Sequence, residues 1–149
     1  MSGEILLLSG PNLDELGLRS PEIYGSESLA WHVARFSANA ESLGFSVRHL
    51  QSNFEGDLIE AVHAARDRSV AIVINAGALT HYSWSLRDAL GAFDGVKVEV
   101  HLSNPGARET FRHVSTLAGV VDGSVAGFGA VSYDLGLQAV RAMVEKSPR

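Results

Sequence analysis

Cysteine is absent from this chain of 149 residues. Neither a disulfide framework nor a thiolate metal site is therefore available, and the chain is compatible with a reducing compartment. Long apolar runs are absent too, since no stretch approaches the roughly 20 residues that a membrane-spanning helix needs. The N-terminal sequence MSGEILLLSG carries an acid where a signal peptide carries basic residues, and its apolar run is too short. We therefore expect a soluble cytoplasmic protein with no membrane contact.

Basic residues are in the minority, with 12 Lys and Arg against 17 Asp and Glu and a formal net charge of −5. Non-specific binding of nucleic acid needs a basic face, so we expect no nucleic-acid partner. An anionic small substrate is compatible with this charge only if basic residues gather locally.

Cofactor motifs are missing as well. The chain has no GxxxxGK[ST] phosphate loop, and no GxGxxG follows its first apolar run. Its six histidines show no HxH, HxxxH or HExxH spacing. We predict neither a metal nor an organic cofactor.

The chain does contain a regular alternation of strand-length apolar runs and longer segments of helical period, which is typical of β/α units and a parallel sheet. Five such units with right-handed crossovers favour a single α/β domain over residues 1–149, a three-layer flavodoxin-like sandwich with strand order 2-1-3-4-5. The expected strands are residues 5–9, 45–50, 70–74, 96–102 and 119–125. The expected helices begin at Ser26 or Ser28, at Asp57, after Ser83 and at Tyr133.

Three polar residues follow neighbouring strands of this predicted sheet. Asn12, Asn75 and His101 come at or just after the carboxyl ends of strands 1, 3 and 4. Ligands of open α/β sheets bind beyond these ends, where the strand order reverses. We therefore expect the three side chains to meet in one crevice.

The sequence GPNLDELGLRSPEIYG at residues 10–25 is an unusually long loop between a strand and a helix, and glycines mark both of its ends. We interpret residues 11–25 as a lid. A tyrosine acts as a base at neutral pH only if its phenolate is stabilised, and Arg19 could do this for Tyr24. The alternative, favoured by spacing alone, is that Arg19 is a solvated charge and Tyr24 packs at the helix start.

Other candidates have equally ordinary alternatives. His101 could be a general acid or could bond backbone at a strand end. Free N–H groups in the turn after it, around Ser103, could receive a carboxylate. Arg112, with or without Arg108, could clamp an anionic or polyhydroxylated ligand, or could pair with Glu109 at the surface. The polar residues after the third strand, Asn75, His81 and Asp88, are also consistent with a turn cap and a solvated helix face.

Taken together, five segments resemble the type II 3-dehydroquinate dehydratases, in order and over essentially the whole chain. They are GPNLDELGLRSPEIYG at 10–25, QSNFEGDLIEAVH at 51–63, INAGALTHYSWSLRDAL at 74–90, VEVHLSN at 98–104 with ARETFRH at 107–113, and DGSVAGFG at 122–129. The resemblance implies a flavodoxin-like fold, a homododecamer built from trimers, and no metal or organic cofactor. It also implies dehydration of 3-dehydroquinate in the shikimate pathway, which leads to chorismate and the aromatic amino acids.

The resemblance also implies roles for individual residues. Tyr24 would remove the C2 proton with Arg19 holding it as phenolate, and Asn12 would position a water on the enolate oxygen. His101 would protonate the departing C1 hydroxyl. The substrate would be held by Asn75, His81, Arg112, the backbone of Leu102 and Ser103, and Asp88 of a neighbouring subunit.

Three positions depart from the family pattern. Ser20 stands where many members have a glutamate, Asp14 where many have an asparagine, and Gly106 replaces a bulkier residue. We expect any effect of these changes to fall on lid closure and substrate affinity, and we expect the chain to be active. They leave open a paralogue that serves quinate breakdown or that dehydrates a related cyclic polyol acid. A receiver domain is disfavoured, because Asn75 stands where a receiver needs a phosphorylatable aspartate.

Overall fold

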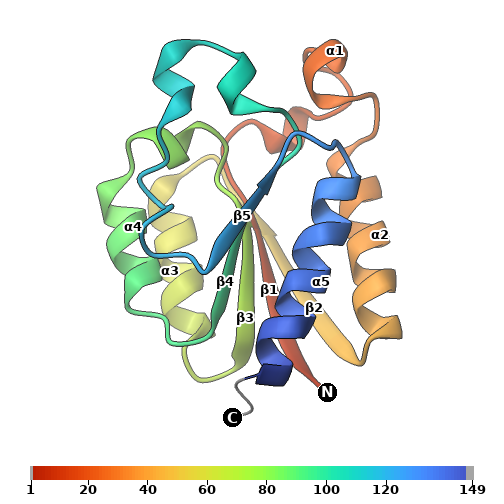
Figure 1. Cartoon of the computed structure of the whole chain (residues 1–149), viewed down its shortest axis with the longest axis vertical. Coiled ribbons are helices and arrows are strands. Elements are labelled where there is room, and N and C mark those ends of the chain that lie inside the picture. The colour runs from red at the N-terminus through yellow and green to blue at the C-terminus, as the bar shows by residue number, and fades with distance from the viewer. Residues whose placement is uncertain (1, 147–149) are drawn as a thin grey trace.

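The computed structural model describes residues 2–146. They contain one five-stranded sheet, in which all neighbouring strands are parallel and the strand order is β2-β1-β3-β4-β5 (Figure 1). The predicted strand order is confirmed. The strands are β1 Gly3–Ser9, β2 Phe45–Gln51, β3 Ser69–Asn75, β4 Val96–His101 and β5 Gly123–Ala126.

Two helical layers enclose this sheet. Helices α2 and α5 cover one face and α3 and α4 cover the other (Figure 1). The helices are α1 Pro21–Tyr24, α2 Leu29–Ser42, α3 Glu55–Ala65, α4 Trp84–Gly91 and α5 Val131–Lys146. Short 3-10 turns occur at η1 Leu13–Glu15, η2 Gly77–His81, η3 Pro105–Ala107 and η4 Thr110–His113. None of the helices within residues 2–146 is long and apolar enough to span a membrane.

Strand β1 shows why the sheet lies in the middle. Its side chains alternate between faces, so Ile5 and Leu7 join the core under α2 and α5, while Leu6 and Leu8 join the core under α3 and α4. All four are at most 1% exposed, and each contributes about 1.5–3 kcal/mol through burial. A strand that is apolar on both faces therefore becomes central.

Strand β1 begins at Gly3 rather than at residue 5, and three further predicted starts were also wrong. Strand β5 starts at Gly123 rather than at residue 119, because Asp122 ends the preceding turns by bonding the backbone of Lys97 through both its side chain and its own N–H. Helix α3 starts at Glu55 rather than at Asp57, whose carboxylate accepts the Ser52 hydroxyl at 2.6 Å instead. The closing helix α5 starts at Val131, two residues before its predicted start.

The segment 107–113 is also not one helix. It contains parts of η3 and η4, with Arg108 in an extended conformation between them. The i, i+4 spacing of Arg108 and Arg112 therefore does not place these two side chains on a helix face.

Candidate active site

A cavity of about 270 Å³ lies beyond the carboxyl ends of β1, β3 and β4. This is the crevice that the strand order predicts. Nine of the ten predicted site residues line it: Asn12, Arg19, Tyr24, Asn75, His81, His101, Leu102, Ser103 and Arg112. The tenth, Asp88, is exposed on α4 and does not line the cavity.

The cavity is basic although the chain as a whole is acidic. Arg19, Arg108 and Arg112 line it, and no aspartate or glutamate is among the lining residues. The side chains of Arg108 and Arg112 are only 15% and 16% exposed. Arg112 still donates to Glu109 at 3.1 Å, so the predicted surface pair and the predicted cavity position both occur. Gathered guanidinium groups favour an anionic ligand.

Two cations lie against the ring of Tyr24, one from the lid and one from the turn after η3. The Arg19 Cζ atom lies 5.0 Å from the centre of the Tyr24 ring, so the two side chains meet as the loop length allows. Arg108 approaches the same ring, with its Cζ atom 5.1 Å from the ring centre, and also donates to the Ser103 hydroxyl at 3.2 Å. A negative charge on this phenol oxygen would be attracted by both guanidinium groups.

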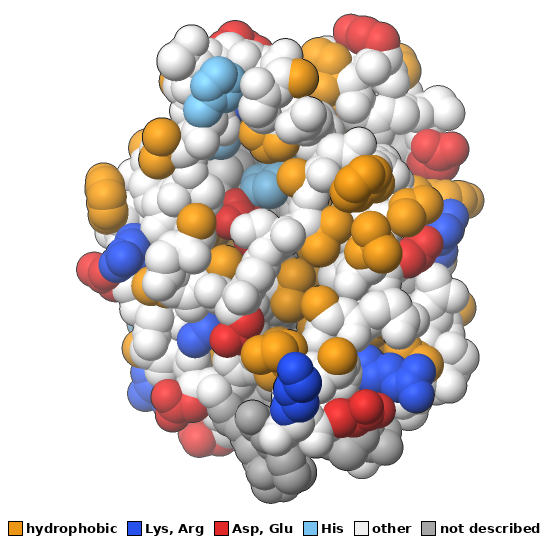
Figure 2. Space-filling model, in the orientation of Figure 1, with side chains coloured by type: hydrophobic (Ala, Val, Ile, Leu, Met, Phe, Trp, Pro, Cys, Tyr) orange, Lys and Arg blue, Asp and Glu red, His pale blue; other side chains and the backbone are white. Residues whose placement is uncertain are grey.

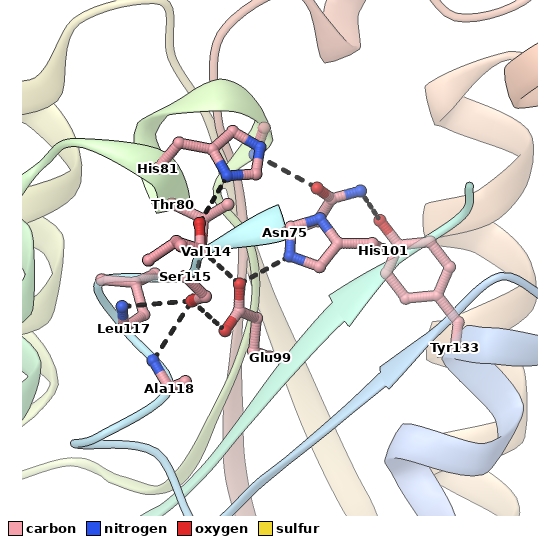
Figure 3. Close-up of polar contacts among 11 residues, drawn as sticks. Asn75, Thr80, His81, Glu99, His101, Val114, Ser115, Leu117, Ala118 and Tyr133 are labelled. Atoms are coloured by element: carbon pink, nitrogen blue, oxygen red, sulfur yellow. Dashed lines mark hydrogen bonds and ion pairs between the residues drawn. The ribbon is translucent and has the colours of Figure 1, made fainter. Parts of the chain in front are cut away.

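A buried carboxylate supports His101, the cavity histidine at the end of β4. Glu99 is 1% exposed, and its Oε2 atom lies 2.6 Å from Nε2 of His101 (Figure 3). Ser115 donates to the other carboxylate oxygen at 2.8 Å, and the Thr80 hydroxyl donates to Oε2.

These contacts decide the charge of Glu99. Burial alone opposes ionisation, but the bonds with His101, Thr80 and Ser115 outweigh it and lower the pKa of Glu99 below its ordinary value of 4.5. The carboxylate is thus ionised at neutral pH. It fixes a proton on Nε2 of His101, while Nδ1 bonds no residue within the described part of the chain.

Sequence reasoning missed Glu99 and left the place of Arg108 open. A strand places residues two apart on one face, so the position of Glu99 two residues before His101 in this alternating strand was a usable signal. Nothing in the sequence indicated that Arg108 would reach Tyr24, because that contact joins the lid to a distant turn.

Asn75 is held from two sides at the end of β3. It is 4% exposed, its Oδ1 atom accepts the Gly77 N–H at 3.2 Å, and its Nδ2 atom donates to the Tyr133 hydroxyl at 3.4 Å (Figure 3). Burial raises the pKa of Tyr133, so its phenol is neutral and able to accept this bond. Asn75 is therefore both the turn cap and the cavity residue that the sequence left as alternatives.

His81 is oriented by η4 and by the residue that follows it. Its Nδ1 atom lies 2.7 Å from the Val114 carbonyl, and its ring meets Phe111 edge to face at 5.9 Å. This fixes the tautomer with the proton on Nδ1 and leaves Nε2 as an acceptor.

The described residues contain no group of three or more His, Asp or Glu side chains placed to hold one metal ion. The chemistry that the cavity residues themselves can supply is acid–base chemistry. A phenol beside two cations and a carboxylate-supported imidazole line the same cavity, which is the pairing that acid–base chemistry needs.

Comparisons with known proteins agree with one another. The family model described as dehydroquinase class II matches residues 3–141. A 3-dehydroquinate dehydratase of Ruegeria pomeroyi is 51% identical over 138 residues, covering 93% of this chain and 93% of that protein. Crystal structures of type II dehydroquinases from Butyrivibrio crossotus and Propionibacterium acnes both give a TM-score of 0.91, at 38% and 39% identity. They cover 93% and 95% of this chain and 97% and 98% of their own.

Proposed function

The chain belongs to the class II dehydroquinase family, and from this membership we infer that it is a 3-dehydroquinate dehydratase. This hydro-lyase eliminates water reversibly from 3-dehydroquinate to give 3-dehydroshikimate. The reaction belongs to the shikimate pathway, and we place it in the cytoplasm. No observation favours the quinate-catabolic alternative or another cyclic polyol acid.

One observation carries this function. A phenol flanked by two guanidinium groups and a carboxylate-supported imidazole line the same cavity. Elimination next to a carbonyl needs a base for the carbon acid and an acid for the leaving hydroxyl, and it needs them on separate groups. The three arginines suit the ring carboxylate of the substrate.

We propose that the reaction begins at Tyr24. Its phenolate, held by Arg19 and Arg108, removes the C2 proton, and the electron pair of that C–H bond moves into the C3 carbonyl to give an enolate. Asn12 positions a water that donates a hydrogen bond to the enolate oxygen. Because this charge exists only after proton removal, the interaction accelerates the step rather than tightening binding.

The second step uses His101. The enolate electrons form the C1–C2 double bond, the C1–O bond breaks, and His101 gives its proton to the departing hydroxyl, which leaves as water. Ionised Glu99 stabilises the imidazolium form from which that proton comes. Tyr24 and His101 then exchange protons with solvent, which restores the starting charges.

The substrate is held by the remaining lining groups. Asn75, His81 and Arg112 bind its hydroxyls and carboxylate, and the backbone N–H groups of Leu102 and Ser103 receive the carboxylate. Gly106 departs from the family pattern within η3, but it does not line the cavity.

Asp88 completes the site from a neighbouring subunit, in a dodecamer built from trimers. Its exposed position outside the cavity of its own chain supports this role. Tyr82 and Trp84, which precede it, are 61% and 66% exposed. Phe128, Val131 and Leu135, just before and within the start of α5, are also exposed. Figure 2 shows apolar side chains gathered where α5 begins. Exposed apolar groups of this kind mark association surfaces.

Steady-state turnover of 3-dehydroquinate, followed by absorbance of the enone product, tests the function. We expect saturable turnover, and none with a quinate analogue that lacks the C3 carbonyl, because no enolate can then form. A folded protein that does not turn over 3-dehydroquinate would contradict the assignment.

A further inference from the structure

We propose that Asn53, just after β2, is a positioning residue that holds Asn12 in its working conformation. The inference rests on the proposed function, since it assigns a role relative to Asn12. It also gives a role to the segment QSNFEG, which runs from the last residue of β2 into the start of α3 and contributes no residue to the cavity lining.

The backbone of Asn12 has an unusual conformation. Its φ is 69° and its ψ is 0°, so it lies in the left-handed region. Among the described residues other than glycine, only Ser20 also has a positive φ. Asparagine tolerates this region better than most residues, but it needs external support to stay there. The Asn12 side chain bonds no other described residue, so it is free to hold a water in the cavity.

Asn53 supplies the support. Its Oδ1 atom accepts the Asn12 N–H at 2.9 Å. Its Nδ2 atom donates to the Asp14 carboxylate at 3.4 Å, so one amide group joins two lid residues. Gln51 donates from Nε2 to both Asn53 Oδ1 and the Gly10 carbonyl, each at 3.2 Å.

Hydrogen bonds of Ser52 fix the segment that carries Asn53 to the sheet. The Ser52 N–H donates to the Ser9 carbonyl of β1 at 3.1 Å, which continues the β1–β2 pairing by one residue. The Ser52 hydroxyl donates to Asp57 at 2.6 Å and accepts the Phe54 N–H at 3.0 Å. Residues 51–54 therefore hold Asn53 in a position fixed by hydrogen bonds to β1 and to α3.

Asn53→Ala removes both bonds and lets Asn12 leave the left-handed region. We expect kcat to fall about 10- to 100-fold, since small misplacements of a catalytic group have effects of this size. KM should change less than threefold, because the Asn12 water acts on the enolate and not on the bound substrate. Gln138→Ala, an exposed change on α5, is the matched control and should leave both constants unchanged.

Two further variants separate positioning from general damage. If Asn53 acts through Asn12, the double variant Asn12→Ala/Asn53→Ala should be no slower than Asn12→Ala alone. Asn53→Asp keeps an oxygen that can accept the Asn12 N–H, but it places a carboxylate next to the carboxylate of Asp14. Adding Asp14→Asn exchanges the two side chains, so that the amide at residue 14 donates to the carboxylate at residue 53. The swap should recover most of the kcat lost in Asn53→Asp.

The proposal is overturned if Asn53→Ala keeps wild-type kcat, if the two alanine effects multiply, or if the swap fails to recover activity. If Asn53→Ala does not fold, the comparison of Asn53→Asp with Asp14→Asn/Asn53→Asp still tests the proposal. Failure of the proposed function looks different, because the unmodified protein would then show no turnover at all.

Discussion

Glu99 and His101 lie on the same face of β4, with the carboxylate Oε2 atom 2.6 Å from Nε2 of the imidazole. The pair spans the boundary between core and cavity, since Glu99 is 1% exposed while His101 lines the cavity. A carboxylate in the core thus sets the tautomer of a cavity histidine, and it is held in turn by Thr80 of η2 and by Ser115 after η4.

Replacement of Glu99 by glutamine tests this pair. The amide has nearly the same size, but it carries no charge to stabilise an imidazolium. We expect kcat to fall about 100-fold or more, within the range for general acid catalysis, with KM changed little. Profiles of kcat against pH for Glu99→Gln and Glu99→Asp measure the effect, and the aspartate, which keeps the charge, should retain more activity. Equal activity of Glu99→Gln and the unmodified protein would show that His101 works without the carboxylate.

Tyr24→Phe removes the proposed base and leaves the ring between the two guanidinium groups. We expect kcat to fall at least about 10³-fold, since general base catalysis contributes up to about 10⁴-fold. Binding of a non-reacting analogue, measured by calorimetry, should weaken by less than tenfold, because the oxygen that is lost acts on the C2 proton and not on the carboxylate. If Tyr24→Phe kept the kcat of the unmodified protein, Tyr24 would not be the base.

The proposed role of Asp88 links activity to assembly. If Asp88 completes the site of a neighbouring subunit as proposed, Asp88→Ala should keep the oligomeric state of the unmodified protein in sedimentation but raise KM, because a substrate-binding group is lost. Mixing it with an inactive Tyr24→Phe protein and letting subunits exchange should restore part of the activity, since some sites then combine Tyr24 and Asp88 from different chains. If a monomer is active, or if activity does not recover after subunit exchange, Asp88 has no role in the site of a neighbouring subunit.

Sequence reasoning reached the strand order and most of the cavity because both depend on local patterns. Apolar runs place β1 and β3 in the centre, and the carboxyl ends of parallel strands then bring Asn12, Asn75 and His101 together. The contacts of Arg108 and Asn53 escaped it. These contacts depend on how the turns between helices and strands approach the lid. The spacing of apolar residues along the sequence carries no information about that approach.

His32 gives a prediction about stability. It is 3% exposed on α2, between Trp31 and Tyr133, and neither ring nitrogen has a hydrogen-bond partner among the described residues. Burial lowers the pKa of His32 below 6.5, and Arg35 adds to this while Glu27 opposes it. The unfolded chain therefore binds a proton more readily than the folded one. The free energy of unfolding is then highest above pH 6.5 and falls as the pH drops below that value.

His32→Phe keeps an aromatic ring in the same space and removes both unsatisfied nitrogens. We expect the free energy of unfolding at pH 7 to rise by about 1 kcal/mol, and its decline between pH 7 and pH 5 to become shallower. The decline should not vanish, since burial also lowers the pKa of His49. Urea unfolding at both pH values, at one protein concentration because assembly contributes, measures this. His63→Gln, an exposed change on α3, is the control. An equal decline in His32→Phe and the unmodified protein would mean that His32 gains a partner or protonates freely in the folded state.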